Sequence, residues 1–176
     1  MSDLSHLPRL TRLLYTSRLP HADEREAAPL DVPTLVAASA AANAAQGITG
    51  SLLLVDGVFI QMLEGPGEAV EATFERICGD LRHRDLQLVD LAEIDYRLFP
   101  EWSMTGCDAG EGAQPDVVID AQEVRFLLNV NAAAAMRHMR QLFDAHAPAA
   151  PAPTTTAGWT ADELNAAARV AEHTTR

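Results

Sequence analysis

Residues 58–66 read VFIQMLEGP, a short apolar run of the kind that forms a buried strand, interrupted by one glutamine. Successive side chains of a strand point to opposite faces, so Gln61 shares a face with Phe59 and Leu63. The opposite face carries Val58, Ile60 and Met62. Two apolar faces predict a strand that is covered on both sides, where an unsatisfied amide costs about 1–3 kcal/mol. The stretch therefore predicts a buried polar partner for Gln61.

The segments around this stretch predict a small sheet. Asp56-Gly57 is a strong hairpin signal and joins the run to a strand at 49–55. Further strands are predicted within 9–18 and 85–94, with a short fifth strand at 102–107. A helix is predicted over 34–46, capped by Asp31 and ended by Gly47, and a second over 65–81.

This order of elements predicts an α+β fold. Strand, helix, strand, strand, helix, strand, plus one more strand, is the ferredoxin-like βαββαβ(β) arrangement, with both helices on one face of the sheet. Tyr15 and Gln61 are then expected on neighbouring strands. In the first helix Leu35, Ser39 and Asn43 recur every four residues, so two polar side chains follow one apolar side chain along the same face.

The composition changes after the fifth strand. Residues 108–116 read as a linker, and Asp120 with Glu123 resembles a capping box that opens one helix over Asp120–Ala145. Its apolar stripe is expected to pack on the sheet face opposite Gln61, as a C-terminal extension at 108–146. The stripe comprises Val124, Leu128, Ala132, Ala135, Met139 and Leu142. The remaining surface, with Phe126, Met136 and Phe143, is expected to contact a second copy or a downstream partner. Residues 147–176 are predicted to be a flexible Ala/Pro/Thr-rich tail with a possible short helix at 160–174.

Charge and composition exclude several classes of protein. The formal net charge of −12 argues against nucleic-acid binding and disfavours membrane surfaces. The chain has no apolar run long enough to span a bilayer, and its first residues lack the apolar core of a signal peptide, so a cytoplasmic protein is expected. Cys78 and Cys107 fit no metal spacing and are expected to be reduced thiols, with no metal bound.

Five features stand out as candidate functional groups, and four of them also have a structural explanation. Tyr15 can be a core residue, Asn43 a helix-end residue, and Trp102 and Met104 plain core. The cluster DLRHRD at 80–85 can be a solvated loop, although its arginines are well suited to phosphate oxygens. Gln61 has no such explanation, because glutamine is rarely buried.

Taken together, these motifs resemble the BLUF family of blue-light receptors that bind FAD. The resemblance is carried by LLYTSR at 13–18, NAAQGITGSLLL at 43–54, FIQMLEGP at 59–66, LRHRD at 81–85 and FPEWSM at 99–104. It covers residues 9–107, which would form the photosensory domain, and implies a flavin between the two helices. The loop from Leu19 to Pro33 is longer than is usual for the family, and Ala42 replaces a residue that is often polar.

The resemblance also implies roles for individual residues. Tyr15 would pass an electron and a proton to the flavin, and Gln61 would rearrange its hydrogen bonds to both. Trp102 and Met104 would carry the change through the fifth strand to the C-terminal helix. The flavin would be bound by Ser39, Asn43, Gln61, Asp80, Arg82 and His83.

Other functions stay open on the sequence alone. The chain could be a small FAD-dependent redox enzyme, although no general base is predicted near Gln61. It could also be a ferredoxin-like binding module without flavin. No effector motif follows the receptor region, so we expect a non-enzymatic sensor that acts on an unknown effector protein and forms a homo-oligomer.

Overall fold

The computed structural model describes residues 9–20, 31–110 and 112–146. Predictions that concern the start of the chain, most of the loop after the first strand, and the tail at 147–176 lie outside these residues.

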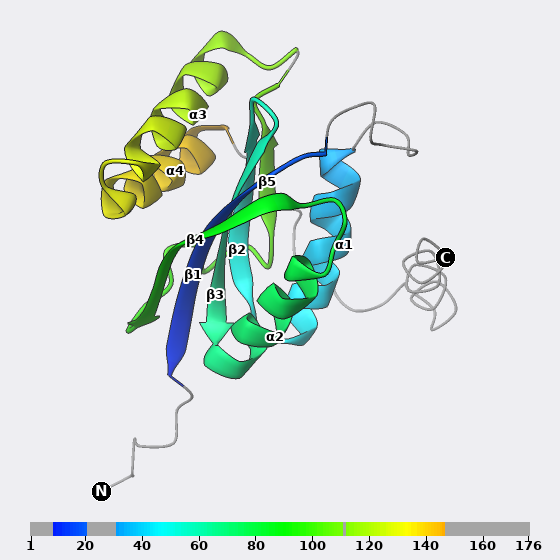
Figure 1. The fold of residues 1–176 in the computed structure, drawn as a ribbon. Coiled ribbons are helices and arrows are strands. Elements are labelled where there is room, and N and C mark those ends of the chain that lie inside the picture. The colour runs from blue at the N-terminus through cyan, green and yellow to red at the C-terminus, as the bar shows by residue number, and fades with distance from the viewer. Residues whose placement is uncertain (1–8, 21–30, 111, 147–176) are drawn as a thin grey trace, which may run out of the picture.

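The described residues form one five-stranded sheet with helices on both faces (Figure 1). The elements are β1 Leu10–Arg18, α1 Val32–Ala45, β2 Thr49–Val55, β3 Val58–Pro66, α2 Gly67–Cys78, β4 Arg84–Ile94, β5 Thr105–Asp108, α3 Pro115–Leu128 and α4 Ala132–His146. The strand order is β4-β1-β3-β2-β5, and only the β2–β5 pair is parallel. The predicted ferredoxin-like α+β architecture is confirmed.

The stretch that predicted the fold is the central strand, β3. It is hydrogen-bonded to β1 on one side and to β2 on the other, so Gln61 lies opposite Tyr15 and opposite Leu52. The hairpin at Asp56-Gly57 has positive φ at both residues, 49° and 71°, as a two-residue turn of this kind requires. The predicted placement of Tyr15 and Gln61 on neighbouring strands is confirmed.

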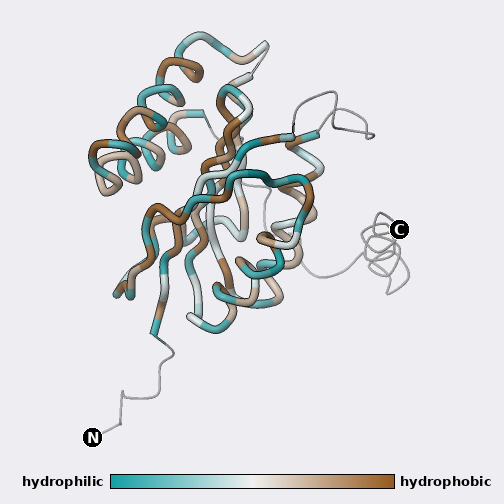
Figure 2. The backbone as a smooth tube through the Cα atoms, in the orientation of Figure 1, coloured by the Kyte–Doolittle hydropathy of each residue, from teal (hydrophilic) through white to brown (hydrophobic). Residues whose placement is uncertain are grey.

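The two faces of the sheet belong to two separate hydrophobic clusters. The face of Gln61 is covered by α1 and α2, and its cluster includes Leu13, Tyr15, Leu52, Phe59 and Leu63. The other face is covered by α3 and α4, and its cluster includes Leu14, Leu53, Ile60, Met62, Val124, Met139 and Phe143. In Figure 2 hydrophilic and hydrophobic residues alternate along α3 and α4. Both faces of β3 are covered, as the sequence predicts.

The first helix lies close to its predicted bounds, beginning at Val32 and ending at Ala45, and the second is shorter. Asp31 is the residue before α1 as predicted, but its carboxylate accepts the Thr34 hydroxyl and caps no backbone N–H. Gly47 adopts a φ of 66° just after the helix, as predicted. Helix α2 ends at Cys78, three residues before the predicted end, and Leu81 beyond it is exposed to solvent.

The prediction of one continuous helix over Asp120–Ala145 is wrong, because this region forms a helical hairpin. Helix α3 begins earlier, at Pro115, which suits a first helical turn, and Asp120 lies inside it. The chain then turns at 129–131, and the Asn131 side chain accepts the Ala134 N–H at 3.1 Å as a new N-cap.

The antiparallel return of α4 brings a second set of apolar residues against the sheet. Met136 and Phe143 are therefore buried, at 5% and 0% exposure, and are not available for the partner contact predicted for them. Phe126 is exposed, as predicted.

Candidate functional site

The buried polar partner predicted for Gln61 is Tyr15. The Tyr15 hydroxyl donates a hydrogen bond to Gln61 Oε1, and Gln61 Nε2 lies 3.8 Å from Met104 Sδ. The three side chains are at most 6% exposed. A thioether is a weak acceptor, so the donor end of the amide is far less well satisfied than the acceptor end. Gln61 thus stands in a chain of three side chains from β1, β3 and the segment before β5.

The environment of Tyr15 keeps its hydroxyl protonated. Burial, and to a lesser extent the nearby Asp80 and Cys78, raise the pKa of Tyr15 well above its ordinary value. Its ring packs against Phe74 of α2, with the centroids 5.4 Å apart. Tyr15 is therefore a neutral hydrogen-bond donor held against a strand and a helix.

Asn43 lies at the end of α1 and holds the segment that leads into β5. Its side chain is 2% exposed, and Nδ2 donates to the Ser103 carbonyl at 3.0 Å. Its own carbonyl accepts the N–H groups of Gln46 and Ile48. Ser39, one turn earlier on the same helix, is partly exposed. The structural explanation for Asn43, a helix-end residue, thus coexists with a position next to the Gln61 chain.

The basic cluster after α2 is tied together and to β1. The Asp80 carboxylate accepts hydrogen bonds from the backbone N–H and the guanidinium of Arg82, with Nε at 2.9 Å. Burial alone would raise the pKa of Asp80, but these bonds outweigh it and lower the pKa. His83 Nδ1 lies 2.7 Å from Ser17 Oγ, and burial lowers the pKa of His83. The His83 ring also packs on Phe59, which places this cluster at the edge of the Gln61 face.

Trp102 and Met104 lie on opposite sides of the sheet. Both precede β5, which begins at Thr105, so the prediction that they belong to the fifth strand is wrong. Met104 joins the cluster around Tyr15 and contacts Gln61. Trp102 packs beside the cluster of the other face, with its ring 6.0 Å from that of Phe99. The structure therefore brings Met104, and not Trp102, into contact with Gln61.

Comparison with known proteins identifies the family. The family profile of BLUF, sensors of blue-light using FAD, matches residues 10–105, more than half of the chain. The chain belongs to the BLUF family. It is a blue-light sensor domain that binds flavin, and FAD is the flavin that BLUF domains use.

Solved BLUF structures share this fold over most of the chain. The dark-state structure of the BLUF protein BlrB has a TM-score of 0.62 at 29% identity, covering 78% of this chain and 97% of that one. The ground-state structure of BlsA also has a TM-score of 0.62, at 26% identity, covering 80% of this chain and 91% of that one. The likeness includes part of the C-terminal region, because 80% of the chain exceeds the share matched by the family profile.

Curated relatives contain the BLUF region as a small part of a longer protein. The beta subunit of photoactivated adenylate cyclase from Euglena gracilis is 40% identical over 97 residues, which is 54% of this chain and 11% of that protein. The alpha subunit from the same organism is 40% identical over 91 residues, 52% of this chain and 8% of that protein. The chain thus spans about a tenth of these relatives.

The side chains of α1 and α2 that face the Gln61 side of the sheet fit a flat, largely apolar ring with polar edges. The cluster on this face is bordered by apolar side chains that are only partly buried. They include Leu35, Val36 and Ala40 of α1 and Phe74 and Ile77 of α2. The incompletely satisfied donor of Gln61 and the buried amide of Asn43 supply groups for the heteroatoms of a flavin ring.

Two further findings concern the described ranges alone. None of their helices is long and apolar enough to cross a membrane. Within the same ranges, no three His, Cys, Asp or Glu residues are arranged to hold a metal ion.

Proposed function

We propose that this BLUF protein is a photoreceptor and not an enzyme, and that light acts by rearranging the hydrogen bonds of Gln61. The observation that carries the proposal is the buried chain from the Tyr15 hydroxyl through the Gln61 amide to the Met104 sulfur. The site offers a reversible hydrogen-bond change, whereas the groups in contact with Gln61 include no acid or base suited to turnover near pH 7.

The proposed binding residues surround this chain. Asn43 and Gln61 would bond the polar edge of the flavin ring, with Ser39 one turn before Asn43. Asp80, Arg82 and His83 would lie at the phosphate end, where a guanidinium is well suited to phosphate oxygens. Bound FAD would supply blue-light absorption and, once excited, the capacity to accept an electron.

In this mechanism Tyr15 is the donor and Gln61 is the switch. The raised pKa of Tyr15 keeps the proton on its hydroxyl in the dark, so both an electron and a proton are available from one buried group. The amide of Gln61 has an acceptor end and a donor end. When the amide turns, Nε2 faces the Tyr15 oxygen, and Oε1 faces Met104. The same side chain then presents the opposite hydrogen-bond pattern without movement of the strand.

The first test is spectroscopic. Purified protein, reconstituted with FAD if necessary, is expected to carry oxidised flavin whose absorption shifts reversibly to longer wavelength under blue light. Identical lit and dark spectra of a flavin-loaded sample would contradict the proposal. Steady-state turnover of an added electron donor would instead favour the small redox enzyme.

Arg82→Ala is expected to weaken FAD binding more than riboflavin binding, because only FAD carries phosphates. Loss of a charged hydrogen bond corresponds to about 1–3 kcal/mol, or roughly 5- to 150-fold in Kd. Fluorescence titration of apoprotein with each flavin measures the difference. Arg76→Ala, which removes an exposed arginine of α2, is the matched control. Equal weakening of both flavins by Arg82→Ala would place Arg82 outside the phosphate site.

The output is proposed to leave through the C-terminal extension to a protein partner in the cytoplasm. In this proposal residues 9–107 are the photosensory domain, 108–146 the extension and 147–176 the tail. Three exposed apolar side chains recur at helical spacing, Ile119 and Phe126 on α3 and Val130 in the turn that follows it. Exposed apolar stripes are typical of protein contacts, so this one is proposed for the effector or for homo-oligomer formation.

A further inference from the structure

The segment Arg97–Met104, between β4 and β5, connects the Gln61 site with the opposite face of the sheet. At its C-terminal end Met104 contacts Gln61, and the Ser103 carbonyl accepts a hydrogen bond from Asn43. The Trp102 carbonyl accepts the Gly50 N–H at 3.0 Å. A change in the hydrogen bonds of Gln61 would therefore act directly on this segment.

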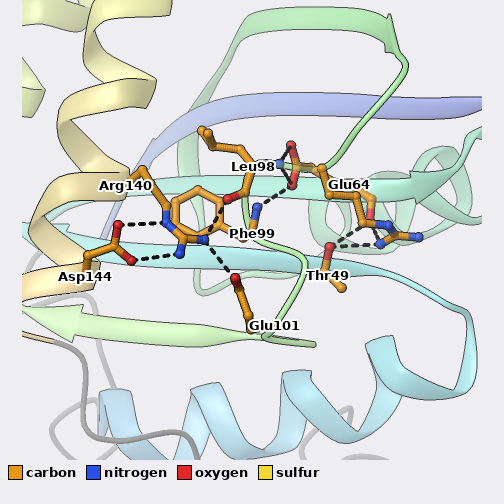
Figure 3. Close-up of polar contacts among 8 residues, drawn as sticks. Thr49, Glu64, Leu98, Phe99, Glu101, Arg140 and Asp144 are labelled. Atoms are coloured by element: carbon orange, nitrogen blue, oxygen red, sulfur yellow. Dashed lines mark hydrogen bonds and ion pairs between the residues drawn. The ribbon is translucent and has the colours of Figure 1, made fainter.

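The N-terminal half of the segment is fixed to the sheet by a buried carboxylate. Glu64 of β3 is fully buried, and its side chain accepts the N–H groups of Leu98 and Phe99 at 2.8–2.9 Å (Figure 3). Arg97 donates to the carbonyls of Glu64 and Gly47 and to the Thr49 hydroxyl. One half is therefore held in place, and the other half contacts Gln61.

A single guanidinium from α4 binds the middle of the segment. Arg140 Nη1 donates to the Leu98 carbonyl at 2.8 Å and to Glu101 Oε2 at 2.9 Å. Its guanidinium carbon lies 5.6 Å from the ring centroid of Phe99 and 5.0 Å from that of Trp102. Asp144, one turn further along α4, accepts a hydrogen bond from Arg140 Nε at 3.0 Å and fixes the orientation of the guanidinium (Figure 3).

These contacts differ in kind from the rest of the packing of α4. Met139, Leu142 and Phe143 are buried in an apolar cluster, whose stabilisation depends on area and not on direction. The Arg140 contacts are hydrogen bonds and ring contacts that depend on direction, so their strength changes when the segment moves. The hydrogen bonds that Arg140 donates to the Asp144 and Glu101 carboxylates raise the pKa of Arg140, which keeps the guanidinium charged.

We propose that Arg140 is the positioning residue that couples the segment Arg97–Met104 to the α3–α4 hairpin, so that a light-driven change at Gln61 reaches the hairpin through this side chain. The inference rests on the proposed photoreceptor function. The coupling would depend on one contact with a carbonyl, one contact with a carboxylate and two aromatic rings, and not on the apolar face of the sheet.

The test compares Arg140→Gln with Arg125→Gln in the full chain loaded with FAD. Arg125 is the matched control, because it also joins the hairpin to the sheet, through Asp56 at 2.7 Å, but does not touch the segment. Hydrogen exchange of peptides covering 97–104 and 115–146 is measured in the dark and under blue light, together with the absorption shift.

In the dark, Arg140→Gln is expected to raise exchange over 97–104 roughly tenfold relative to Arg125→Gln, because an anchor of the segment is lost. Under light, wild type and Arg125→Gln are expected to change exchange over 115–146. Arg140→Gln is expected to keep the absorption shift and lose most of that change. If Arg140→Gln does not fold, Glu101→Gln weakens the same contact from the other side.

Three outcomes would overturn the coupling role. The first is that Arg140→Gln leaves dark exchange over 97–104 unaltered, and the second is that Arg140→Gln keeps the wild-type light response over 115–146. The third is that exchange over 115–146 in the wild type does not change under light. Each is separate from failure of the proposed function, which appears as a missing absorption shift in the wild type. The dark measurement does not depend on photochemistry at all.

Discussion

Gln61→Leu is expected to retain bound flavin and to lose the light-induced absorption shift, which should fall below about a tenth of the wild-type amplitude. Leucine has a similar volume and keeps the apolar face intact, but it has neither the acceptor for the Tyr15 hydroxyl nor the donor beside Met104. The buried phenol is left without its partner, at an expected cost of about 1–3 kcal/mol in unfolding free energy. Light-minus-dark absorption spectra and chemical denaturation measure the two effects.

The matched control is Gln87→Leu, which makes the same change at an exposed position on β4. It is expected to keep the spectral shift. Tyr15→Phe removes the hydroxyl from the other side of the hydrogen bond and is expected to reproduce the loss seen in Gln61→Leu. A normal photocycle in Gln61→Leu or in Tyr15→Phe would show that the roles proposed for this pair are wrong.

Glu64→Leu is expected to give the largest loss of stability of any single change considered, roughly 2–6 kcal/mol. Two backbone N–H groups, those of Leu98 and Phe99, lose their acceptor in a buried setting, at about 1–3 kcal/mol each. Denaturation by urea, with the midpoint and slope compared between variants, measures the loss.

Two variants define the cause of that loss. Glu64→Gln keeps one acceptor oxygen in the same place and is expected to be less destabilised than Glu64→Leu. Glu93→Leu removes a glutamate from β4 whose partner Arg9 is exposed, and little change is expected. Equal stability of Glu64→Leu and Glu93→Leu would show that the buried carboxylate does not hold the segment.

The strands and helices, and their order along the chain, could be predicted because the sequence signals for them are local. Alternation along 58–66, the Asp56-Gly57 turn and the Asp31 and Gly47 helix ends each need only a few neighbouring residues. The topology predicted neighbouring strands for Tyr15 and Gln61, and the family resemblance implied the contact between their side chains. These are the parts of the site that the sequence alone could identify.

The C-terminal region was harder because its apolar spacing continues across the turn. Residues 124–142 keep a helical repeat, so the pattern does not reveal that the chain reverses at 129–131. The overlooked signals were Pro115, which suits a helix start, and Asn131, which suits an N-cap. A straight helix would leave Met136 and Phe143 on its surface, whereas the hairpin turns both toward the sheet.

The roles of Glu64 and Arg140 could not be predicted because their partners are distant in the chain. Glu64 lies on the covered face with Ile60 and Met62, so its burial follows from the strand pattern in the same way as that of Gln61, but its partners do not. Its partners lie 34 and 35 residues away, in an irregular segment. The contact of Arg140 with Leu98 spans 42 residues and depends on the hairpin.

The position of Gln61 in the middle of β3 limits the kind of change that light can cause there. The backbone of this strand is bonded to a neighbour on each side, and its two faces are packed against separate clusters. The backbone of Gln61 is therefore held on both sides and on both faces, while the end of its side chain can rotate about single bonds. In the proposed mechanism, rotation of the Gln61 amide changes the direction of two hydrogen bonds and does not strain the backbone. Reversal would then require only a rotamer change, which suits a receptor that returns to its starting state after each photon.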